Sequence, residues 1–362
     1  MTQSIAIIGA GVSGLYTASL LQQMGQAVTV YEARDRIGGR IVSVAGTHGD
    51  EADRFDLGPT WYWPDTETVI TDLVAELGLT AFAQHTTGAM VLERQAGAIE
   101  HHLLAPDSIV PSKRLAGGME ALVTAIASQL PAASLRLQTR VTKLERTGQQ
   151  VIVTSIKDGR MTSETYDSVV VALPPRLVER VAIEPPFSET TREKLQTTPT
   201  WMAGQAKALV VYDTPFWREA GLSGFGMSWV GAMQEIHDAS PQRGPGALFG
   251  FLRLTAEERQ SLGTEAVKAC ILEQLITMYG EAARHPREVF YYDWAQDLDT
   301  ATPADARPLT EFPQYRPIAV DANWQGRLYL AGTETDSAFG GHVEGALRSA
   351  KRVVAEWTMR HG

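Results

Sequence analysis

A glycine-rich turn close to the first residue has the residue types and the spacing to bind a phosphate group. Gly9, Gly11 and Gly14 stand in G-x-G-x-x-G spacing between an apolar segment, expected to be a strand, and a segment typical of a helix. Such glycines allow a tight turn, a close approach of the backbone to a pyrophosphate and close packing of helix on strand. A second strand, expected at residues 27–31, leads to Glu32, whose carboxylate suits the two hydroxyls of a ribose and would repel a 2′-phosphate. The pattern predicts a bound adenine dinucleotide.

A second turn of the same kind lies near the other end of the chain. Residues 328–331 form a short apolar segment expected to be a strand, residues 332–334 interrupt it, and Gly340 and Gly341 open a segment typical of a helix. Unpaired backbone N–H groups and the helix dipole favour negative charge at such a place. Two phosphate-binding turns in one chain predict a dinucleotide that is held from both sides, with its reactive end pointing into the protein.

Further segments resemble the flavin-containing monoamine oxidase family and follow the order in which that family has them. They are EARDRIGGR at 32–40, DLGPTWYWP at 56–64, LAGGMEALVTAIASQL at 115–130, YDSVVVALPP at 166–175 and AGTET at 331–335. Pro59 and Thr60 replace the Gly and the Ala or Gln often seen in the second segment. The resemblance covers nearly the whole chain and is closest to a short, bacterial-type member.

The resemblance implies an α/β fold, in which a Rossmann-like FAD-binding domain is interleaved with an α+β substrate domain. Residues 1–80, 114–196 and 297–362 are expected to build the FAD-binding domain, and residues 81–113 and 197–296 the substrate domain. In larger monoamine oxidases the first of these two inserts supplies helices that roof the cavity. It is much shorter here, so we expect a more open active site or one closed by a partner subunit.

The resemblance also implies which residues contact FAD. In that family the arginine of the GG-Arg turn reaches the FAD phosphates, the loop matching residues 56–64 lies along the flavin ring, and the residue matching Val141 contacts adenine through its backbone. The expected FAD contacts are Gly9, Gly11, Val12, Ser13, Gly14, Glu32, Ala33, Arg34, Gly39, Arg40, Gly58, Pro59, Thr60, Trp61, Val141, Gly332, Thr333, Glu334, Gly341, His342 and Val343.

Lys207 is the first candidate for a catalytic role. It stands in an apolar segment, GQAKALVVYDTPFW, expected to be a strand at residues 206–212. A buried ammonium is costly unless it is paired, so a lysine here requires an explanation. In the resembled family the matching lysine lies near flavin N5 and holds a water, which implies a role in reoxidation by oxygen. The alternative is a lysine at a domain edge that reaches solvent.

His342 is the second candidate and departs most from the resembled family. That family commonly has an aromatic residue, often Tyr, at this place, where it forms one wall of a cage beside the flavin. A histidine presents a flat ring as well, and unlike Tyr it titrates near neutral pH. No aromatic residue stands where the second wall is expected. Trp61, Trp294 and Phe339 are therefore named as candidate substrate contacts.

Composition narrows the remaining possibilities. The chain has 362 residues, a formal net charge of −10 and one cysteine. An acidic chain argues against a nucleic-acid partner, and no apolar run approaches the ~18 residues needed to cross a bilayer. With no visible signal peptide, we expect a cytoplasmic protein that is not bound to a membrane.

The cysteine and histidine positions bear on covalent attachment and on metals. Cys270 lies among apolar residues at helical spacing and is expected in the core. No cysteine stands at residues 294–319, before the C-terminal turn, so attachment of FAD through cysteine is excluded and non-covalent FAD is expected. His101 and His102 are adjacent and would point to opposite faces of a strand, so no metal site is expected.

The predicted reaction is the FAD-dependent oxidation of a small-molecule amine. A hydride leaves the carbon beside nitrogen for flavin N5, water hydrolyses the imine to an aldehyde or ketone, and O₂ reoxidises the flavin and becomes H₂O₂. Two alternatives stay open: an FAD-dependent desaturase or oxidase of a non-amine carbon skeleton, and a flavin-holding regulatory protein without turnover. The identity of the amine and the oligomeric state are left open as well.

Overall fold

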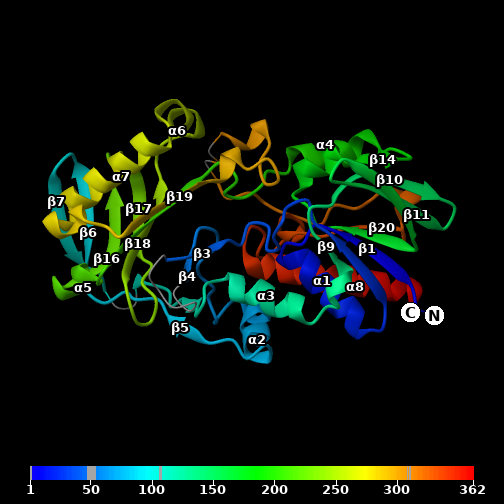
Figure 1. Ribbon diagram of the computed structural model, residues 1–362, viewed down its shortest axis with the longest axis horizontal. Coiled ribbons are helices and arrows are strands. Elements are labelled where there is room, and N and C mark those ends of the chain that lie inside the picture. Colours follow the sequence, from blue (N-terminus) through cyan, green and yellow to red (C-terminus); the bar gives the residue numbers. More distant parts are fainter. Residues whose placement is uncertain (1, 47–53, 106–107, 308, 310) are drawn as a thin grey trace.

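The computed structural model describes residues 2–46, 54–105, 108–307, 309 and 311–362. The chain forms two lobes, one at each end of its long axis (Figure 1). One lobe contains a five-stranded parallel sheet of order β20-β13-β1-β2-β9, and the other a seven-stranded sheet of order β19-β15-β18-β17-β16-β6-β7. The α/β fold predicted from the sequence is confirmed.

The parallel sheet is assembled from segments far apart in the sequence. Its strands are β1 (Ser4–Ile8), β2 (Ala27–Tyr31), β9 (Leu135–Arg136), β13 (Ser168–Val171) and β20 (Leu328–Leu330). Side chains alternate along a strand, so Ile5 and Ile7 pack against helices on one face while Ala6 and Ile8 pack on the other. The helices of the first face are α1 (Val12–Gln23), α2 (Thr68–Glu76), α3 (Glu120–Ser128) and α8 (Val343–His361).

The second face of the parallel sheet is covered by a four-stranded sheet of order β12-β11-β10-β14. Its strands are β10 (Arg140–Thr147), β11 (Gln150–Lys157), β12 (Arg160–Tyr166) and β14 (Ala182–Glu184), and α4 (Glu189–Thr197) lies beside it (Figure 1). This lobe therefore has three layers, with the parallel sheet in the middle.

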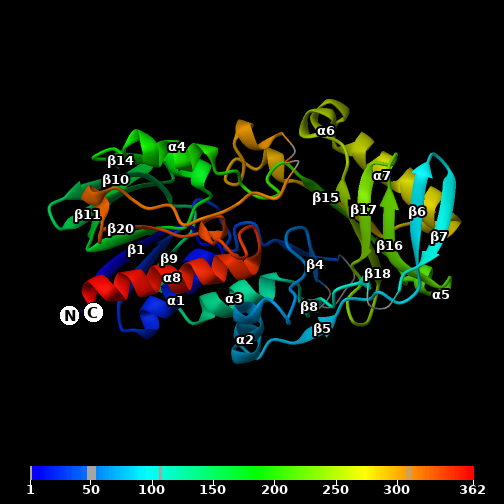
Figure 2. The same cartoon turned by 180° about the vertical axis from the view of Figure 1, so that it is seen from behind.

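The seven-stranded sheet carries helices on the face turned away from the first lobe (Figure 2). Its strands are β6 (Ala89–Gln95), β7 (Ala98–Leu103), β15 (Ala206–Tyr212), β16 (Leu222–Ser228), β17 (Met233–Asp238), β18 (Gly246–Leu252) and β19 (Glu288–Asp293). The helices of this face are α5 (Phe216–Glu219) and α7 (Thr264–Tyr279), and the short helix α6 (Ala256–Leu262) precedes α7 in the chain. Alternation along β15 places Ala208 and Val210 against α7, whereas Leu209 packs with Phe55 and Leu57 of the first lobe.

Short elements connect the two lobes. Two small antiparallel pairs are formed by β3 (Ser43–Ala45) with β4 (Arg54–Asp56) and by β5 (Ala81–Ala83) with β8 (Lys113–Leu115).

Short 3-10 helices occur in both lobes and between them. They are η2 (Ala132–Ser134), η3 (Pro175–Arg180), η4 (Glu281–Arg284), η5 (Trp294–Gln296), η6 (Pro303–Asp305), η7 (Ala322–Trp324) and η8 (Thr333–Thr335). Residues 81–105 and 108–113 contain no α-helix, so this insert supplies no helical roof in its described part. The domain boundaries stay a prediction.

The position expected for Cys270 is wrong, because the residue is exposed on α7. The buried stripe of that helix runs through Val267, Ile271, Leu275 and Met278, and residue 270 lies on its flank. Within the described part of the chain, every helix is too short or too polar to cross a bilayer, and no group of three or more His, Cys, Asp or Glu residues could hold a metal ion.

Gly14 tests the packing of α1 on the turn that precedes it. A Cβ at residue 14 would lie 2.0 Å from the carbonyl oxygen of Gly9, whereas a Cβ at Gly11 would meet no atom within 4 Å. Gly14→Ala is expected to destabilise the protein by about 1–3 kcal/mol or more, because turn and helix must separate. Gly11→Ala, the matched control, should change stability by no more than about 1 kcal/mol. Urea unfolding of the proteins without bound ligand measures both, and equal stabilities would contradict the packing argument.

Candidate active site

A cavity extends from the carboxyl ends of β1 and β2 to β15 and β18 of the seven-stranded sheet. In open α/β sheets, ligands bind beyond the carboxyl ends of parallel strands. Most residues singled out in the sequence line this cavity, namely Gly9, Gly11, Val12, Ser13, Glu32, Ala33, Arg34, Gly39, Arg40, Gly58, Pro59, Thr60, Trp61, Val141, Lys207, Trp294, Gly332, Thr333, Glu334, Gly341, His342 and Val343. The structure therefore brings together residues from both ends of the chain.

The two glycine-containing turns meet at the cavity. The backbone N–H of Gly332 donates to the hydroxyls of Ser13 and Ser349 at 3.1 and 3.0 Å, and these two hydroxyls lie 2.9 Å apart. Gly11 immediately precedes α1 and borders open space in the cavity. Backbone that is free of side chains at a helix N-terminus is suited to an anionic group such as a pyrophosphate.

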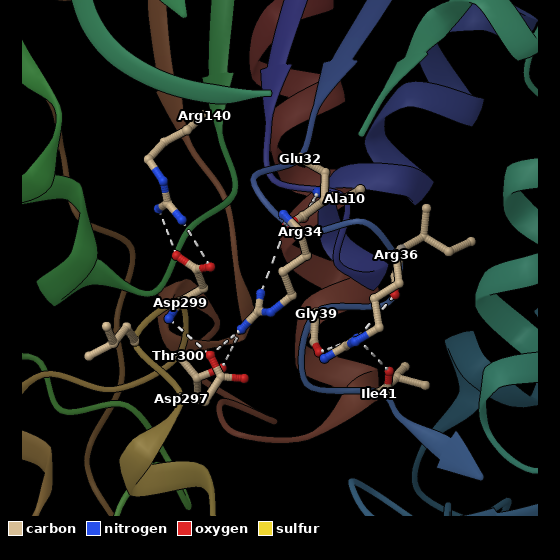
Figure 3. Close-up of polar contacts among 12 residues, drawn as sticks. Ala10, Glu32, Arg34, Arg36, Gly39, Ile41, Arg140, Asp297, Asp299 and Thr300 are labelled. Atoms are coloured by element: carbon tan, nitrogen blue, oxygen red, sulfur yellow. Dashed lines mark hydrogen bonds and ion pairs between the residues drawn. The ribbon is translucent and has the colours of Figure 1, made fainter. Parts of the chain in front are cut away.

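Glu32 has a fixed carboxylate at the end of β2. One of its oxygens accepts the backbone N–H of Ala10 and the other that of Arg34, both at 2.9 Å (Figure 3). Each carboxylate oxygen has a second lone pair that can accept a ribose hydroxyl. Val141 of β10 lines the same cavity, so the residues predicted for the adenosine end are present in one place.

Asp299 and Thr300 line this end of the cavity, and two arginines bind the segment 297–300 to which they belong (Figure 3). Arg34 donates to Asp297 at 2.7 Å and to Thr300 at 3.0 Å. Arg140 forms a two-point ion pair with Asp299, with N···O distances of 2.7 and 3.0 Å. A segment from the last third of the sequence is thereby attached to β10 and to the residues after β2.

Arg40 and Glu334 form a two-point ion pair in the cavity wall. The N···O distances are 2.6 and 3.0 Å, and the Glu334 side chain is fully buried. Burial alone would lower the pKa of Arg40, but the charge and hydrogen bonds of Glu334 outweigh it and raise that pKa. Arg36 donates to the carbonyl of Gly39 at 3.0 Å and thereby shapes the turn before Arg40 (Figure 3). Glu334 thus positions Arg40, which keeps its positive charge beside the cavity.

Lys207 lies on the face of β15 that is turned to the first lobe. Its Nζ donates to the carbonyl of Gly58 at 2.9 Å and to the hydroxyl of Thr60 at 2.5 Å, and it lies 3.9 Å from the centre of the Phe249 ring. The residue is 2% exposed, so it does not reach solvent as the alternative interpretation requires. Carbonyl, hydroxyl and aromatic face are all groups that stabilise a cation.

Burial lowers the pKa of Lys207 to about 7. The negative charge of Asp56 opposes this effect, and the positive charge of Arg114 adds to it. Burial also raises the pKa of Asp56, although Lys207 lies near it. A buried lysine that changes charge near neutral pH, next to a cavity, is typical of a functional site.

His342 immediately precedes α8 and lines the cavity. Its Nδ1 lies 2.6 Å from a carboxylate oxygen of Glu67, the residue before α2. The other Glu67 oxygen accepts the backbone N–H of Trp63 at 2.9 Å. The ring centre of His342 lies 5.6 Å from that of Trp63 and 6.2 Å from that of Phe312, so two aromatic residues that were not singled out in the sequence are its neighbours.

Two residues named in the sequence lie outside the cavity lining. Gly14 packs against the Gly9 carbonyl, so it shapes the turn from behind. The Phe339 ring lies 5.5 Å from the guanidinium of Arg348 on α8. The role of Phe339 as a substrate contact stays a prediction.

Several lining residues were missed in the sequence, namely Trp63, Arg140, Trp201, Met202, Gln205, Phe251, Asp299 and Thr300. Trp63 had a local signal, because residues two apart in an extended segment lie on the same side, and Trp61 was already a candidate. The other residues reach the cavity through long-range packing. Neighbouring residues in the sequence carry no sign of that packing.

The lining fits an adenine dinucleotide at one end and an organic substrate at the other. Residues 89–356 match the profile of the family described as flavin containing amine oxidoreductase, and residues 7–77 match an NAD(P)-binding Rossmann-like domain. The first match spans most of the 362-residue chain. Both agree with the arrangement of the two lobes around the cavity.

Individual relatives agree with the family match. The protein AofH of Mycobacterium tuberculosis, named for the flavin-containing monoamine oxidases, is 26% identical over 462 aligned positions, which cover 98% of this chain and 96% of AofH. Putrescine oxidase of Kocuria rosea is 26% identical over 470 positions, which cover 98% of this chain and 95% of that enzyme. Both alignments are longer than the 362 residues of this chain, so these relatives carry insertions that it lacks.

A solved structure shows the same fold. Cyclohexylamine oxidase from Brevibacterium oxydans superimposes with a TM-score of 0.81 at 19% identity, over the full length of both chains. The family match over residues 89–356 spans most of the chain, so the chain belongs to the flavin-containing amine oxidoreductases and is a flavin-dependent amine oxidase whose cofactor is FAD.

Proposed function

We propose that this protein oxidises an apolar monoamine to an aldehyde or ketone, with O₂ as the electron acceptor and H₂O₂ as the second product. One observation carries the proposal. The loop at residues 58–63 contacts Lys207 through Gly58 and Thr60 and contacts His342 through Trp63, and all of them line one cavity. No second G-x-G-x-x-G segment after a strand is present in the sequence, which favours oxygen over a nicotinamide cofactor as the acceptor.

Different residues of this chain would bind the cofactor and orient the amine. FAD, when bound, supplies the acceptor for the hydride that leaves the carbon beside the amine nitrogen. Of the residues that would hold FAD, Gly11 would leave room for the pyrophosphate, Glu32 would accept the ribose hydroxyls, and Arg40 would place a positive charge near the phosphates. The aromatic side chains at the other end exclude water and orient the amine, which must be neutral for the hydride to leave.

The composition of the substrate end favours an apolar substrate with one amino group. Trp61, Trp63, Trp201, Met202 and Phe251 line it together with Gln205 and Lys207. The acidic residues among the described lining are Glu32, Asp299 and Glu334, and each already binds an arginine side chain or backbone N–H groups. A second ammonium group of a diamine would therefore be buried without a carboxylate partner.

The cofactor is proposed to be bound without a covalent bond. The one cysteine of the chain lies on α7 and does not line the cavity. Acid precipitation of the purified yellow protein is expected to release FAD into the supernatant, where its absorbance is measured. Flavin that stays with the pellet would show a covalent link and contradict this prediction.

Lys207→Met is expected to slow reoxidation of the reduced cofactor much more than its reduction by amine. The lysine is positive below its pKa of about 7 and stabilises negative charge that develops on oxygen, so the wild-type reoxidation rate should fall as pH rises through 7. The variant should show no such step. Stopped-flow measurement times the two half-reactions separately. An equal loss in both, with FAD content retained, would assign Lys207 to substrate positioning instead.

An aromatic monoamine such as benzylamine is expected to exceed putrescine by roughly 100-fold in kcat/KM, which corresponds to about 3 kcal/mol for an unpaired buried ammonium. The relative from Kocuria rosea is named for putrescine, so the two proteins should differ in preference. Peroxide release from a panel of mono- and diamines measures it. Equal rates with both would refute the substrate class, and failure of every amine to bleach the flavin without oxygen would favour oxidation of a carbon skeleton.

A further inference from the structure

His342 is held in one orientation by contacts at both its backbone and its ring. Its backbone N–H donates to the carbonyl of Phe339 at 3.1 Å, and its own carbonyl accepts from the Ala346 N–H at 3.2 Å and the Thr333 hydroxyl at 2.7 Å. Glu67 occupies ring nitrogen Nδ1 at 2.6 Å. No described residue hydrogen-bonds to Nε2, so Nε2 is the ring nitrogen available to a ligand in the cavity.

Glu67 is a buried carboxylate, and among the described residues His342 is the side chain in position to balance its negative charge. The residue is 2% exposed, and its two oxygens are used by the Trp63 N–H and by His342. Among the described residues, no lysine or arginine forms an ion pair with it. A carboxylate that accepts a hydrogen bond from Nδ1–H fixes the tautomer of a neutral imidazole, leaves a lone pair on Nε2 and stabilises the imidazolium that forms when Nε2 gains a proton.

We propose that Glu67 and His342 act as a proton-accepting pair that converts the bound ammonium form of the substrate into the free amine. The proposal rests on the proposed function, which requires a neutral amine. In this step an N–H bond of the ammonium breaks, its electron pair stays on nitrogen, and the proton forms a bond to Nε2 of His342. Glu67 keeps its charge throughout. His342 is the catalytic residue of this step, and Glu67 is a positioning residue.

The other charged side chains near His342 and Glu67 have partners of their own or are exposed. On α8, the carboxylate of Glu344 accepts the backbone N–H groups of α2 at residues 69 and 70, and Arg348 pairs with Asp336. Asp65 and Glu311 are exposed on the segments that carry Trp63 and Phe312, whose rings flank the imidazole.

His342 immediately precedes α8, and Lys207 lines the same cavity. Glu67 is the charged side chain in direct contact with the imidazole.

Glu67→Gln is the decisive variant. A glutamine still accepts the Trp63 N–H, but its amide donates to Nδ1 and forces the proton of the neutral imidazole onto Nε2, which removes the base without removing the ring. Flavin reduction by benzylamine, measured without oxygen by stopped flow, should then depend on free amine already present in solution. A lysine-type ammonium has a pKa of about 10.4 and that of benzylamine is roughly one unit lower, so kred/Kd of the variant should rise roughly tenfold per pH unit from pH 7 to about 9 and then level off.

The wild-type value should stay nearly flat over the same range, so the two proteins should differ by about 100-fold or more at pH 7 and converge towards pH 10. His342→Gln should give the same slope, and the double variant should lose no more than either single variant, because the two residues act as a unit. Glu76→Gln, the same substitution at an exposed position of α2, is the matched control and should behave as wild type.

Each outcome of these reduction measurements either supports or overturns the proposed role of Glu67 and His342. A loss in Glu67→Gln that is equal at every pH would assign Glu67 a purely structural role, and an unchanged profile would remove the pair from the reaction; either result overturns the proposal. Failure of the wild type to be reduced by any amine at any pH would instead refute the proposed function. FAD absorbance of each variant confirms that the cofactor site is intact.

Discussion

The backbone N–H of Gly332, shared between the hydroxyls of Ser13 and Ser349, joins the two ends of the sequence at the point on which the cofactor site depends. Ser13 lies in the first turn of α1 and Ser349 on α8, so this one group sets the distance between two helices and between the turns that precede them. A buried N–H that lost these partners would be costly, which makes the arrangement specific. The phosphate end of the cavity and the ring of His342 are both placed relative to it.

The site also depends on the direction in which β15 presents its side chains between the two lobes. A strand buried on both faces alternates its side chains, and this alternation directs Lys207 towards Gly58 and Thr60 rather than towards α7. Desolvation then has the largest effect on the pKa of Lys207 and lowers it. The nearby Asp56 is itself buried, so its negative charge does not restore the usual pKa. A strand of ordinary apolar composition thereby carries a group that titrates near neutral pH.

Some elements could be predicted from their own residues and immediate neighbours in the sequence. The turn at Gly9, the strand that leads to Glu32 and the strand that carries Lys207 have periodicity and neighbours that determine them. Cys270 shows the limit of such patterns, because helical spacing identifies a stripe but not its edge. Phe339 shows another, since the direction of a ring in an irregular turn depends on contacts made elsewhere.

The hydrogen-bond partners of the site residues could not be predicted from the sequence, because they too depend on contacts with distant parts of the chain. Glu67 and His342 are separated by 275 positions, and Arg140 and Asp299 by 159. Such pairs depend on the tertiary fold, and no property of either residue alone reveals them. The resemblance to a family identified the positions, whereas their hydrogen bonds required the structure.

The order of strands in the parallel sheet has a consequence for how the chain is made. Strand β1 leaves the ribosome early, but its neighbour β13 follows about 160 residues later, and β20, which completes that edge, comes after most of the chain. Until then, apolar strands have open edges, and open edges of this kind favour association with other chains. The loop-closure entropy of such distant pairings also slows folding. Biogenesis of this enzyme should therefore be governed by completion of synthesis, and ribosomal stalling within the last third would leave aggregation-prone chains instead of a partly active protein.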